Sequence, residues 1–405
     1  MIGGRLIDGT GKEPLENSII VIEGRLITRV GTVDRIQPPA AAKTVDLAGH
    51  TIMPGLMDLH VHLCAGEGEV LLSLSLLDKP MTLIGVKGFA RARKALEMGF
   101  TTLRDAGDIG HLAVSLREAI NSGVVEGPRI IAGGRYLSAT GGQGDLLPPW
   151  LQRTDAAGNV ADGADEIRKY VRQQIKMNND WIKFAATGTG LRAAWDEQQF
   201  SDEEMKVIVG ESHAKGRKVF AHCGYFKGTL AAVRAGVDSV EHGCERTEEL
   251  CDLMVEKGTF LVPTLIAVNS LVQGGERLGF SAQIQENYRH MLESQVRSFK
   301  TALEAGVKIA LGTDAGLPTV PHGASASELE LLVRYGLRPM QAIMAATSQA
   351  ASCLKMEDKL GTVEEGKLAD LVVVQGDPLE DIKVLQVREN IKMVLKEGAV
   401  YVNRL

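Results

Sequence analysis

Two histidines separated by one residue, His60 and His62, close an apolar run that begins at Ile52. In an extended strand, residues i and i+2 point to the same side of the chain. The two imidazoles are therefore expected to project together from the end of a buried strand. Because neutral imidazole is a common ligand of divalent transition metals, this spacing predicts a metal site.

Four further side chains that could take part in such a site stand at or near the ends of later β-type runs. They are Lys183, His222, His242 and Asp314. A single histidine in such a position is more often an ordinary core or surface residue than a ligand. Six groups that all end β-type runs are hard to obtain by chance, so we interpret them as one site.

Lys183 is the unusual member of this set, because a protonated ammonium has no lone pair and repels a cation. It could simply neutralise an acidic loop. The alternative is that burial lowers the pKa of the amine, which in its neutral form can add carbon dioxide and become a carbamate. A carbamate is an anionic oxygen ligand that could bridge two metal ions about 3.5–4 Å apart, which would share a hydroxide.

The elements that must position these residues are short apolar runs that alternate with helical segments. We count eight β-type runs, at 52–60, 101–105, 129–132, 181–185, 218–222, 239–242, 259–264 and 308–314. Between them, Ser201-Asp-Glu-Glu204 has the form of a capping box, and Gly236 is expected to end the following helix. Residues 323–356 read as helix after the eighth run.

Eight β-then-α units predict an α/β fold, a (β/α)8 TIM barrel with its site at the carboxyl ends of the strands. An open, doubly wound sheet is the alternative. No Gly-x-Gly-x-x-Gly or Walker-type loop follows the first strand, so nothing in the sequence favours nucleotide binding there.

Both ends of the chain have the alternating pattern of β-strands and lack long helical periods. Residues 4–31 contain a turn signal at Glu23-Gly24, and residues 361–402 have a similar texture. We predict that the two ends pair into a small composite β-sandwich domain, formed by residues 1–53 and 358–405. Residues 54–357 would then form the barrel of a metal-dependent hydrolase.

The composition is that of an ordinary globular protein and restricts the classes of partner. The 405 residues are 44% hydrophobic and carry a net charge of −6, which disfavours non-specific binding to nucleic acid. Five cysteines without CxxC spacing indicate a reducing compartment, and no apolar run approaches a membrane span. We expect a cytoplasmic protein that forms a homo-oligomer, acts on a small molecule and binds neither nucleic acid nor membrane.

Over nearly its whole length the chain resembles the amidohydrolase superfamily. The motifs that carry the resemblance are Pro54-Gly-Leu-Met-Asp-Leu-His-Val-His62, Thr101-Thr-Leu-Arg-Asp-Ala-Gly107, Glu241-His-Gly243, Gly312-Thr-Asp-Ala-Gly316 and Gly366-Lys-Leu-Ala-Asp-Leu371. Within the superfamily, the chain looks like the branch of Xaa-Pro dipeptidases (prolidases) and imidazolonepropionases.

This resemblance implies a binuclear zinc site. His60 and His62 with Asp314 would hold the first zinc, and His222 and His242 would hold the second. Lys183, carboxylated by CO2 to N6-carboxylysine, would bridge both ions. Asp314 would also act as general base and then as general acid, taking the proton as hydroxide attacks and delivering it to the leaving amine.

Three other residues are expected to contact the substrate. Gln143 occupies a place where the family pattern leads us to expect histidine, and an amide can donate to a substrate carbonyl but cannot protonate it. Tyr225 follows His222 by three residues and could reach the same carbonyl or a substrate carboxylate, unless it packs as an ordinary loop tyrosine. His322 could line the rim after the eighth strand.

The substrate is less well defined by the sequence. The segment Asp145-Leu-Leu-Pro-Pro-Trp-Leu151 is unusually apolar for a rim loop and could form a wall for an imino-acid ring, although such loops often pack on neighbouring elements. A cationic substrate would need a carboxylate, for which Asp145, Glu67 and Glu69 are the candidates. We therefore expect hydrolysis of small Xaa-Pro dipeptides. The alternatives are a dipeptidase for another C-terminal residue, a one-metal hydrolase of cyclic amides and a non-catalytic scaffold.

Overall fold

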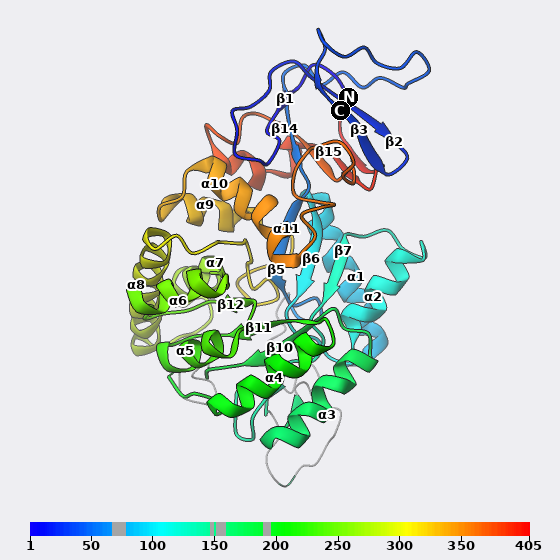
Figure 1. Cartoon of the computed structure of the whole chain (residues 1–405). Coiled ribbons are helices and arrows are strands. Elements are labelled where there is room, and N and C mark those ends of the chain that lie inside the picture. The colour runs from blue at the N-terminus through cyan, green and yellow to red at the C-terminus, as the bar shows by residue number, and fades with distance from the viewer. Residues whose placement is uncertain (67–77, 146–149, 151–158, 189–195) are drawn as a thin grey trace.

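A computed structural model describes residues 1–66, 78–145, 150, 159–188 and 196–405 of the chain. Parallel strands and the helices that follow them make up most of the molecule (Figure 1). Both termini lie at one end of it, together with a second, mainly antiparallel set of strands.

The parallel strands form two sheets. The first is ordered β5-β6-β7, with β5 at Leu56–Val61, β6 at Phe100–Asp105 and β7 at Arg129–Ala132. The second is ordered β13-β12-β11-β10-β8-β9. Its strands are β8 (Leu137–Ser138), β9 (Asn159–Val160), β10 (Trp181–Ala185), β11 (Lys218–His222), β12 (Ser239–Glu241) and β13 (Phe260–Val262). Strand order thus follows the order of the predicted runs.

Backbone hydrogen bonds join the two sheets at both junctions. The Asp180 amide, directly before β10, donates to the Ala132 carbonyl at the end of β7 at 2.9 Å. On the other side, the Leu261 amide donates to Lys308 and the Leu59 amide donates to Leu311, both at 2.9 Å. The predicted eighth run therefore lies between β13 and β5. It makes isolated bridges there instead of a regular strand.

Helices follow the strands in the expected alternation. They are α1 (Met81–Glu97), α2 (Leu112–Asn121), α3 (Gly163–Lys176), α4 (Asp202–Ala214), α5 (Phe226–Ala235), α6 (Glu248–Lys257), α7 (Leu265–Gly274) and α8 (Ala282–Glu304). The capping box of α4 is confirmed, because the Glu204 amide donates to the Ser201 hydroxyl and the Ser201 amide donates to the Glu204 carboxylate. Gly236 ends α5 with a φ of 95°.

The helical reading of residues 323–356 was too coarse. Three short helices cover this stretch, namely α9 (Ala326–Arg334), α10 (Pro339–Ala345) and α11 (Ser348–Leu354). Pro339 stands at the start of α10, where a missing amide hydrogen costs nothing, and Gly336 takes a positive φ of 138° just before it. These two residues explain the first interruption.

Strands from both ends of the chain share one five-stranded sheet, as the β-type texture of both ends led us to expect. Its order is β1-β4-β14-β15-β16, from β1 (Arg5–Leu6), β4 (His50–Pro54), β14 (Leu371–Gln375), β15 (Ile391–Lys396) and β16 (Ala399–Asn403). A hairpin of β2 (Ser18–Glu23) and β3 (Leu26–Thr32) turns at the predicted Glu23-Gly24 step. Side chains of the sheet and the hairpin bury one shared cluster.

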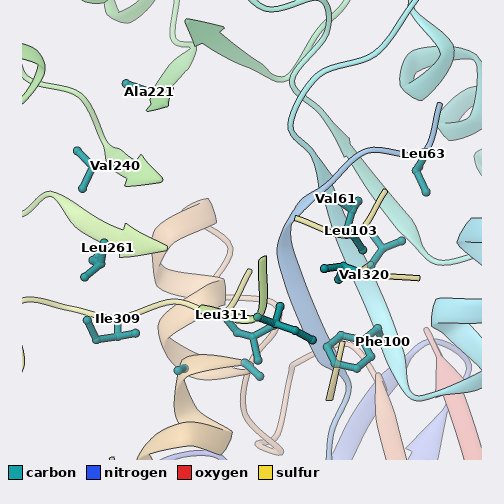
Figure 2. Close-up of a cluster of buried hydrophobic side chains, with 14 of the residues drawn as sticks. Val61, Leu63, Phe100, Leu103, Ala221, Val240, Leu261, Ile309, Leu311 and Val320 are labelled. Carbon is teal, nitrogen blue, oxygen red and sulfur yellow. The ribbon is translucent and has the colours of Figure 1, made fainter. Parts of the chain in front are cut away.

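Alternate residues of the parallel strands face two different apolar clusters. Leu261 and Leu311 belong to the large cluster shown in part in Figure 2, which includes residues of the surrounding helices. Their neighbours Val262 and Ala310 belong to a second cluster with Phe220 of β11. This period of two is the one that strands covered on both faces require.

Candidate metal centre and active site

His60 and His62 meet Asp314 where β5 ends. Asp314 Oδ1 lies 3.1 Å from His62 Nε2 and 3.6 Å from His60 Nε2. One ligand atom from each of the three residues lies within 4.8 Å of the other two, so the three side chains could hold a metal ion. Asp314 has a φ of 61°, an uncommon conformation for a residue with a Cβ and one that is often found at functional sites.

The far nitrogen of three of the histidines is held by a hydrogen bond. His60 Nδ1 lies 2.6 Å from Glu241 Oε2, and His62 Nδ1 donates to the Gly107 carbonyl at 2.9 Å. His242 Nδ1 lies 2.7 Å from the Thr264 hydroxyl. Such contacts fix the tautomer and the ring orientation of metal-binding histidines, and they leave each Nε2 for a ligand.

A buried polar network among the parallel strands supports His60. Both oxygens of Glu241 lie within 2.9 Å of Arg104 Nη2, and the Ser239 hydroxyl donates to Glu241 at 2.6 Å. Arg104 also lies over the aromatic rings of Trp181 and Phe220. Neither Glu241 nor Arg104 was among the predicted site residues. The sequence does mark them, because each is a charged residue inside a β-type run.

His222 and Lys183 complete the group on the side of β10 and β11. The ring centroids of His222 and His242 lie 4.6 Å apart, and those of His60 and His242 lie 4.7 Å apart. His222 Nε2 and Lys183 Nζ are both buried, and within the described part of the chain neither has a hydrogen-bond partner. Buried polar atoms without partners are costly, so both atoms fit a site that binds a further group.

The charge states of these residues suit metal binding. Burial lowers the pKa of His222 and brings that of His242 to about 3, which keeps both imidazoles neutral. Asp314 is buried too, but its hydrogen bond with His62 and the nearby imidazoles hold its pKa below the usual value, so it stays ionised. Burial lowers the pKa of Lys183 to about 8, against the opposing charge of Glu241. The amine is thus neutral more often than a surface lysine.

A cavity of about 490 Å³ opens beside this group. Gln143 and Tyr225, both predicted to contact the substrate, line it. The Gln143 side-chain oxygen is buried without a hydrogen-bond partner among the described residues, and burial raises the pKa of Tyr225 to about 12. Tyr225 therefore keeps its proton and can donate it in a hydrogen bond. Tyr136, which the sequence analysis did not single out, also lines the cavity.

Two expected site residues lie elsewhere. His322 is outside the described lining of the cavity, and its Nε2 donates to the Ala65 carbonyl at 3.0 Å. Asp145 is also outside that lining, and its carboxylate accepts the Gly141 amide. The other two candidates for a cationic pocket, Glu67 and Glu69, fall outside the described residues.

Among the described residues, the apolar side of the cavity comes from α7, α8 and the segments beside them. Of the predicted apolar loop 145–151, only Asp145 and Trp150 are described, and Trp150 is 81% exposed. Nine apolar or aromatic side chains of the lining instead come from α7, α8, their connection and the segment after Asp314. They are Ala267, Val268, Leu271, Leu278, Phe280, Tyr288, Met291, Leu317 and Pro318.

The cysteines near the site are small buried neighbours. All five cysteines are buried and free. Burial raises the pKa of Cys223 to about 12 and that of Cys244 to about 11, so both remain thiols, which bind metals poorly.

Known proteins are similar to this chain in sequence and in fold. Residues 51–400 match the amidohydrolase family. The chain belongs to that family. Ochratoxinase of Aspergillus niger is 34% identical over 422 residues, which cover 98% of this chain and 85% of that enzyme. The resemblance that the motifs implied is confirmed.

Two solved structures are similar over almost the whole chain. A prolidase complexed with N-methylphosphonate-L-proline has a TM-score of 0.90 and 32% identity, and the match covers 99% of this amidohydrolase and 98% of that chain. A Xaa-Pro dipeptidase with methionine bound in its active site has a TM-score of 0.87 and 35% identity, with 99% of each chain covered.

Among the described helices, none has the length and apolar character needed to cross a membrane.

Proposed function

We propose that this amidohydrolase is a binuclear zinc enzyme that cleaves the amide bond of small dipeptides, with Xaa-Pro dipeptides as its main substrates. One observation supports this most strongly. The buried atoms Lys183 Nζ and His222 Nε2 lack hydrogen-bond partners among the described residues, in the same cavity that His60, His62 and Asp314 line.

The six residues fit a pair of metal ions. His60, His62 and Asp314 would hold one ion, and His222 and His242 would hold the other. Lys183, once carboxylated by CO2, would contribute an oxygen to each. When bound, the metal pair supplies an activated water and polarises the scissile carbonyl.

The remaining steps belong to side chains of the chain itself. Asp314 is ionised and lies beside His60 and His62, so an oxygen that does not hold the ion can take the proton of the attacking water and pass it to the leaving nitrogen. Tyr225 and the Gln143 amide can donate hydrogen bonds to the substrate carbonyl or carboxylate. Glu241 keeps the His60 ring in place through Nδ1.

The preference for a proline on the carboxyl side rests on two supports. Both solved structures described above are named as Xaa-Pro dipeptidases or prolidases, and one holds a proline phosphonate. In addition, Asp314 is the only carboxylate among the described residues that line the cavity, which disfavours arginine or lysine in the substrate. A hydrophobic residue on the carboxyl side is the second candidate, because most of the lining is apolar.

The larger architecture is part of the same proposal. Hydrogen bonds at both junctions between the parallel sheets support one closed (β/α)8 barrel over residues 54–357. The sheet and hairpin shared by the two ends support a composite β-sandwich domain of residues 1–53 and 358–405.

A dipeptide library and a metal analysis test the function together. We expect the purified, zinc-loaded protein to bind two zinc ions per chain and to hydrolyse Xaa-Pro dipeptides faster than dipeptides that end in arginine or lysine. Hydrolysis of a cyclic amide with one metal bound, and full activity after loss of Lys183, would favour the cyclic-amide alternative. No metal after incubation with zinc and bicarbonate would favour a scaffold.

A further inference from the structure

The α7–α8 side of the cavity differs in chemistry from the side that carries the histidines. Val268 and Leu271 of α7 line it, followed by Leu278 and Phe280 of the connection and Met291 of α8. The charged or titratable side chains of the described lining, tyrosines and the Cys244 thiol aside, are the four histidines, Lys183 and Asp314. The α7–α8 side can therefore make apolar contacts with a substrate group, but it has no charged side chain that could pair with a charged substrate group.

Aromatic rings are already arranged on this side. The rings of Phe280 and Tyr288 are stacked, with centroids 5.5 Å apart and an angle of 23° between their planes. Leu278 is 37% exposed, so part of this apolar surface faces solvent when the cavity holds no substrate. Covering such surface is favourable roughly in proportion to its area, and an aromatic side chain buries about 150–250 Å².

Hydrogen bonds fix the α7–α8 side relative to the metal-binding residues. The Glu328 carboxylate accepts the amides of Leu265 and Ile266, the first residues of α7, at 2.8 and 2.7 Å. Thr264, directly before α7, contacts His242 through its hydroxyl. Gln295 of α8 donates to the Pro263 carbonyl at 2.8 Å. The apolar side is thus set at a fixed distance from the site of hydrolysis, as a specificity pocket requires.

We propose that the α7–α8 side is a specificity pocket for a bulky apolar group, preferably aromatic, on one side of the scissile amide. This proposal rests on the proposed function and specifies its substrates: N-acylated amino acids or dipeptides in which one side chain or acyl group is aromatic. A cavity of about 490 Å³ has room for such a group beside the amide, since pockets for drug-sized ligands start at about 300 Å³.

Matched substrate pairs test the proposal in the zinc-loaded wild-type protein. Phe-Pro against Ala-Pro varies the amino side of the amide, and Ala-Phe against Ala-Ala varies the carboxyl side. We expect the aromatic member of at least one pair to have a kcat/KM about tenfold higher or more, a usual effect of apolar pocket contacts. A difference below threefold in both pairs would overturn the proposal.

Substitutions on the α7–α8 side test whether the preference for aromatic substrates arises there. Leu278→Glu adds a charge at a partly exposed position of the pocket, and Phe280→Ala removes a ring. Both are expected to lower the aromatic-to-small ratio of kcat/KM about tenfold. Val255→Glu is the matched control, because Val255 lies in α6, is 47% exposed and is outside the described lining. An unchanged ratio in both pocket variants would show that the preference arises elsewhere.

A binding measurement separates this proposal from the proposed function. By calorimetry, the zinc-loaded protein should bind phenylalanine, a reaction product with no amide to hydrolyse, about tenfold more tightly than alanine, and Leu278→Glu should remove the difference. If no dipeptide is hydrolysed but this difference is found, the proposed function fails and the pocket stands. If dipeptides are hydrolysed and both amino acids bind equally, the pocket fails and the function stands.

Discussion

Lys183 is a buried amine that lies among imidazoles. Its positive charge would oppose metal binding there, whereas the negative charge of a carbamate would favour it. Its Nζ lies 4.7 Å from the centroid of the Phe220 ring and lacks a hydrogen-bond partner among the described residues. An ammonium in this place would repel any cation bound by the histidines. A carbamate would instead supply the anionic oxygens that two divalent ions need between them.

Replacement of Lys183 by alanine is therefore expected to lower kcat by at least about a hundredfold and zinc content from two ions to about one. Small carboxylic acids such as acetate or propionate should restore part of the activity, because they can fill the space and supply an oxygen ligand. Metal analysis and dipeptide hydrolysis measure the two effects. Turnover like that of the wild type would exclude the bridging role.

Formation of the carbamate should depend on pH in a direction set by the lysine. Burial lowers the pKa of Lys183 to about 8, and only the neutral amine reacts with CO2. The neutral fraction is roughly a tenth at pH 7 and close to complete at pH 9, whereas an ordinary lysine would be almost fully protonated at both. Carbamate formation in the metal-free protein should therefore rise from pH 7 to 9 and then level off.

Carbon-13 NMR with labelled bicarbonate measures this directly, since a carbamate carbon has its own resonance. Lys183→Ala is the control and should lack that resonance at every pH. A signal that grows only above pH 10 would mean that the amine behaves as a surface lysine.

The residues proposed as metal ligands could be picked out from the sequence because their spacing carries the information. His60 and His62 alternate along one strand, and the other four follow further β-type runs. The supporting partners could not be found in this way, because contacts such as His60 with Glu241 join strands 181 residues apart in the chain. The role of His322 stays a prediction, because the ring lies outside the described lining of the cavity and its Nε2 donates to the Ala65 carbonyl.

At the scale of elements, α7 connects the metal-binding residues with the apolar side of the cavity. The first amides of a helix have no partner within it, and here the buried carboxylate of Glu328 in α9 accepts two of them. The sequence gives no sign of this contact, because Glu328 lies more than sixty residues after the first two residues of α7. The same distance along the chain hid the role of α7 and α8 in lining the cavity.

Replacement of Glu328 by alanine is expected to destabilise the protein by about 3 kcal/mol, because two buried amides lose their acceptor. Glu328→Gln should lose less, since its carbonyl can still accept one of them. Chemical denaturation followed by circular dichroism measures both. The control is Glu293→Ala, at a side chain 65% exposed on α8, which should change stability by less than about 0.5 kcal/mol. Equal stability of all three variants would contradict the capping role.

The parallel strands could be predicted well from the sequence, because one signal, a continuous apolar run, marks each of them. Continuous apolar runs identified the parallel strands, because both faces of these strands are covered. Segment 308–314 was recognised by the same signal, yet it forms only isolated bridges with β13 and β5. The apolar loop 145–151 stays a predicted substrate wall, but its described residue Trp150 is exposed, so apolar composition alone does not show that a side chain lines the cavity.

For the whole molecule, the sequence indicated that the two ends meet but not how they attach to the parallel sheets. Arg129 of β7 makes that attachment. Its guanidinium donates to Asp370 at 2.8 Å, just before β14, and to Glu397 at 2.7 Å, between β15 and β16. The side chains of Arg129 and Asp370 are 12% and 4% exposed, so water screens this ion pair little.

Arg129→Met should therefore lower the free energy of unfolding by about 3 kcal/mol at neutral pH, because it leaves a buried carboxylate without its cation. Partial burial raises the pKa of Glu397, but the hydrogen bond and charge of Arg129 outweigh this and hold it below the usual value. The part of the stabilisation that comes from Glu397 is thus fully present above about pH 4.3, the pKa of an ordinary glutamate, and is lost as the pH falls through the lowered pKa of Glu397. Calorimetric scans should show a gap in Tm at pH 7 that narrows at pH 3. A gap of the same size at both pH values would mean that Arg129 acts by packing alone.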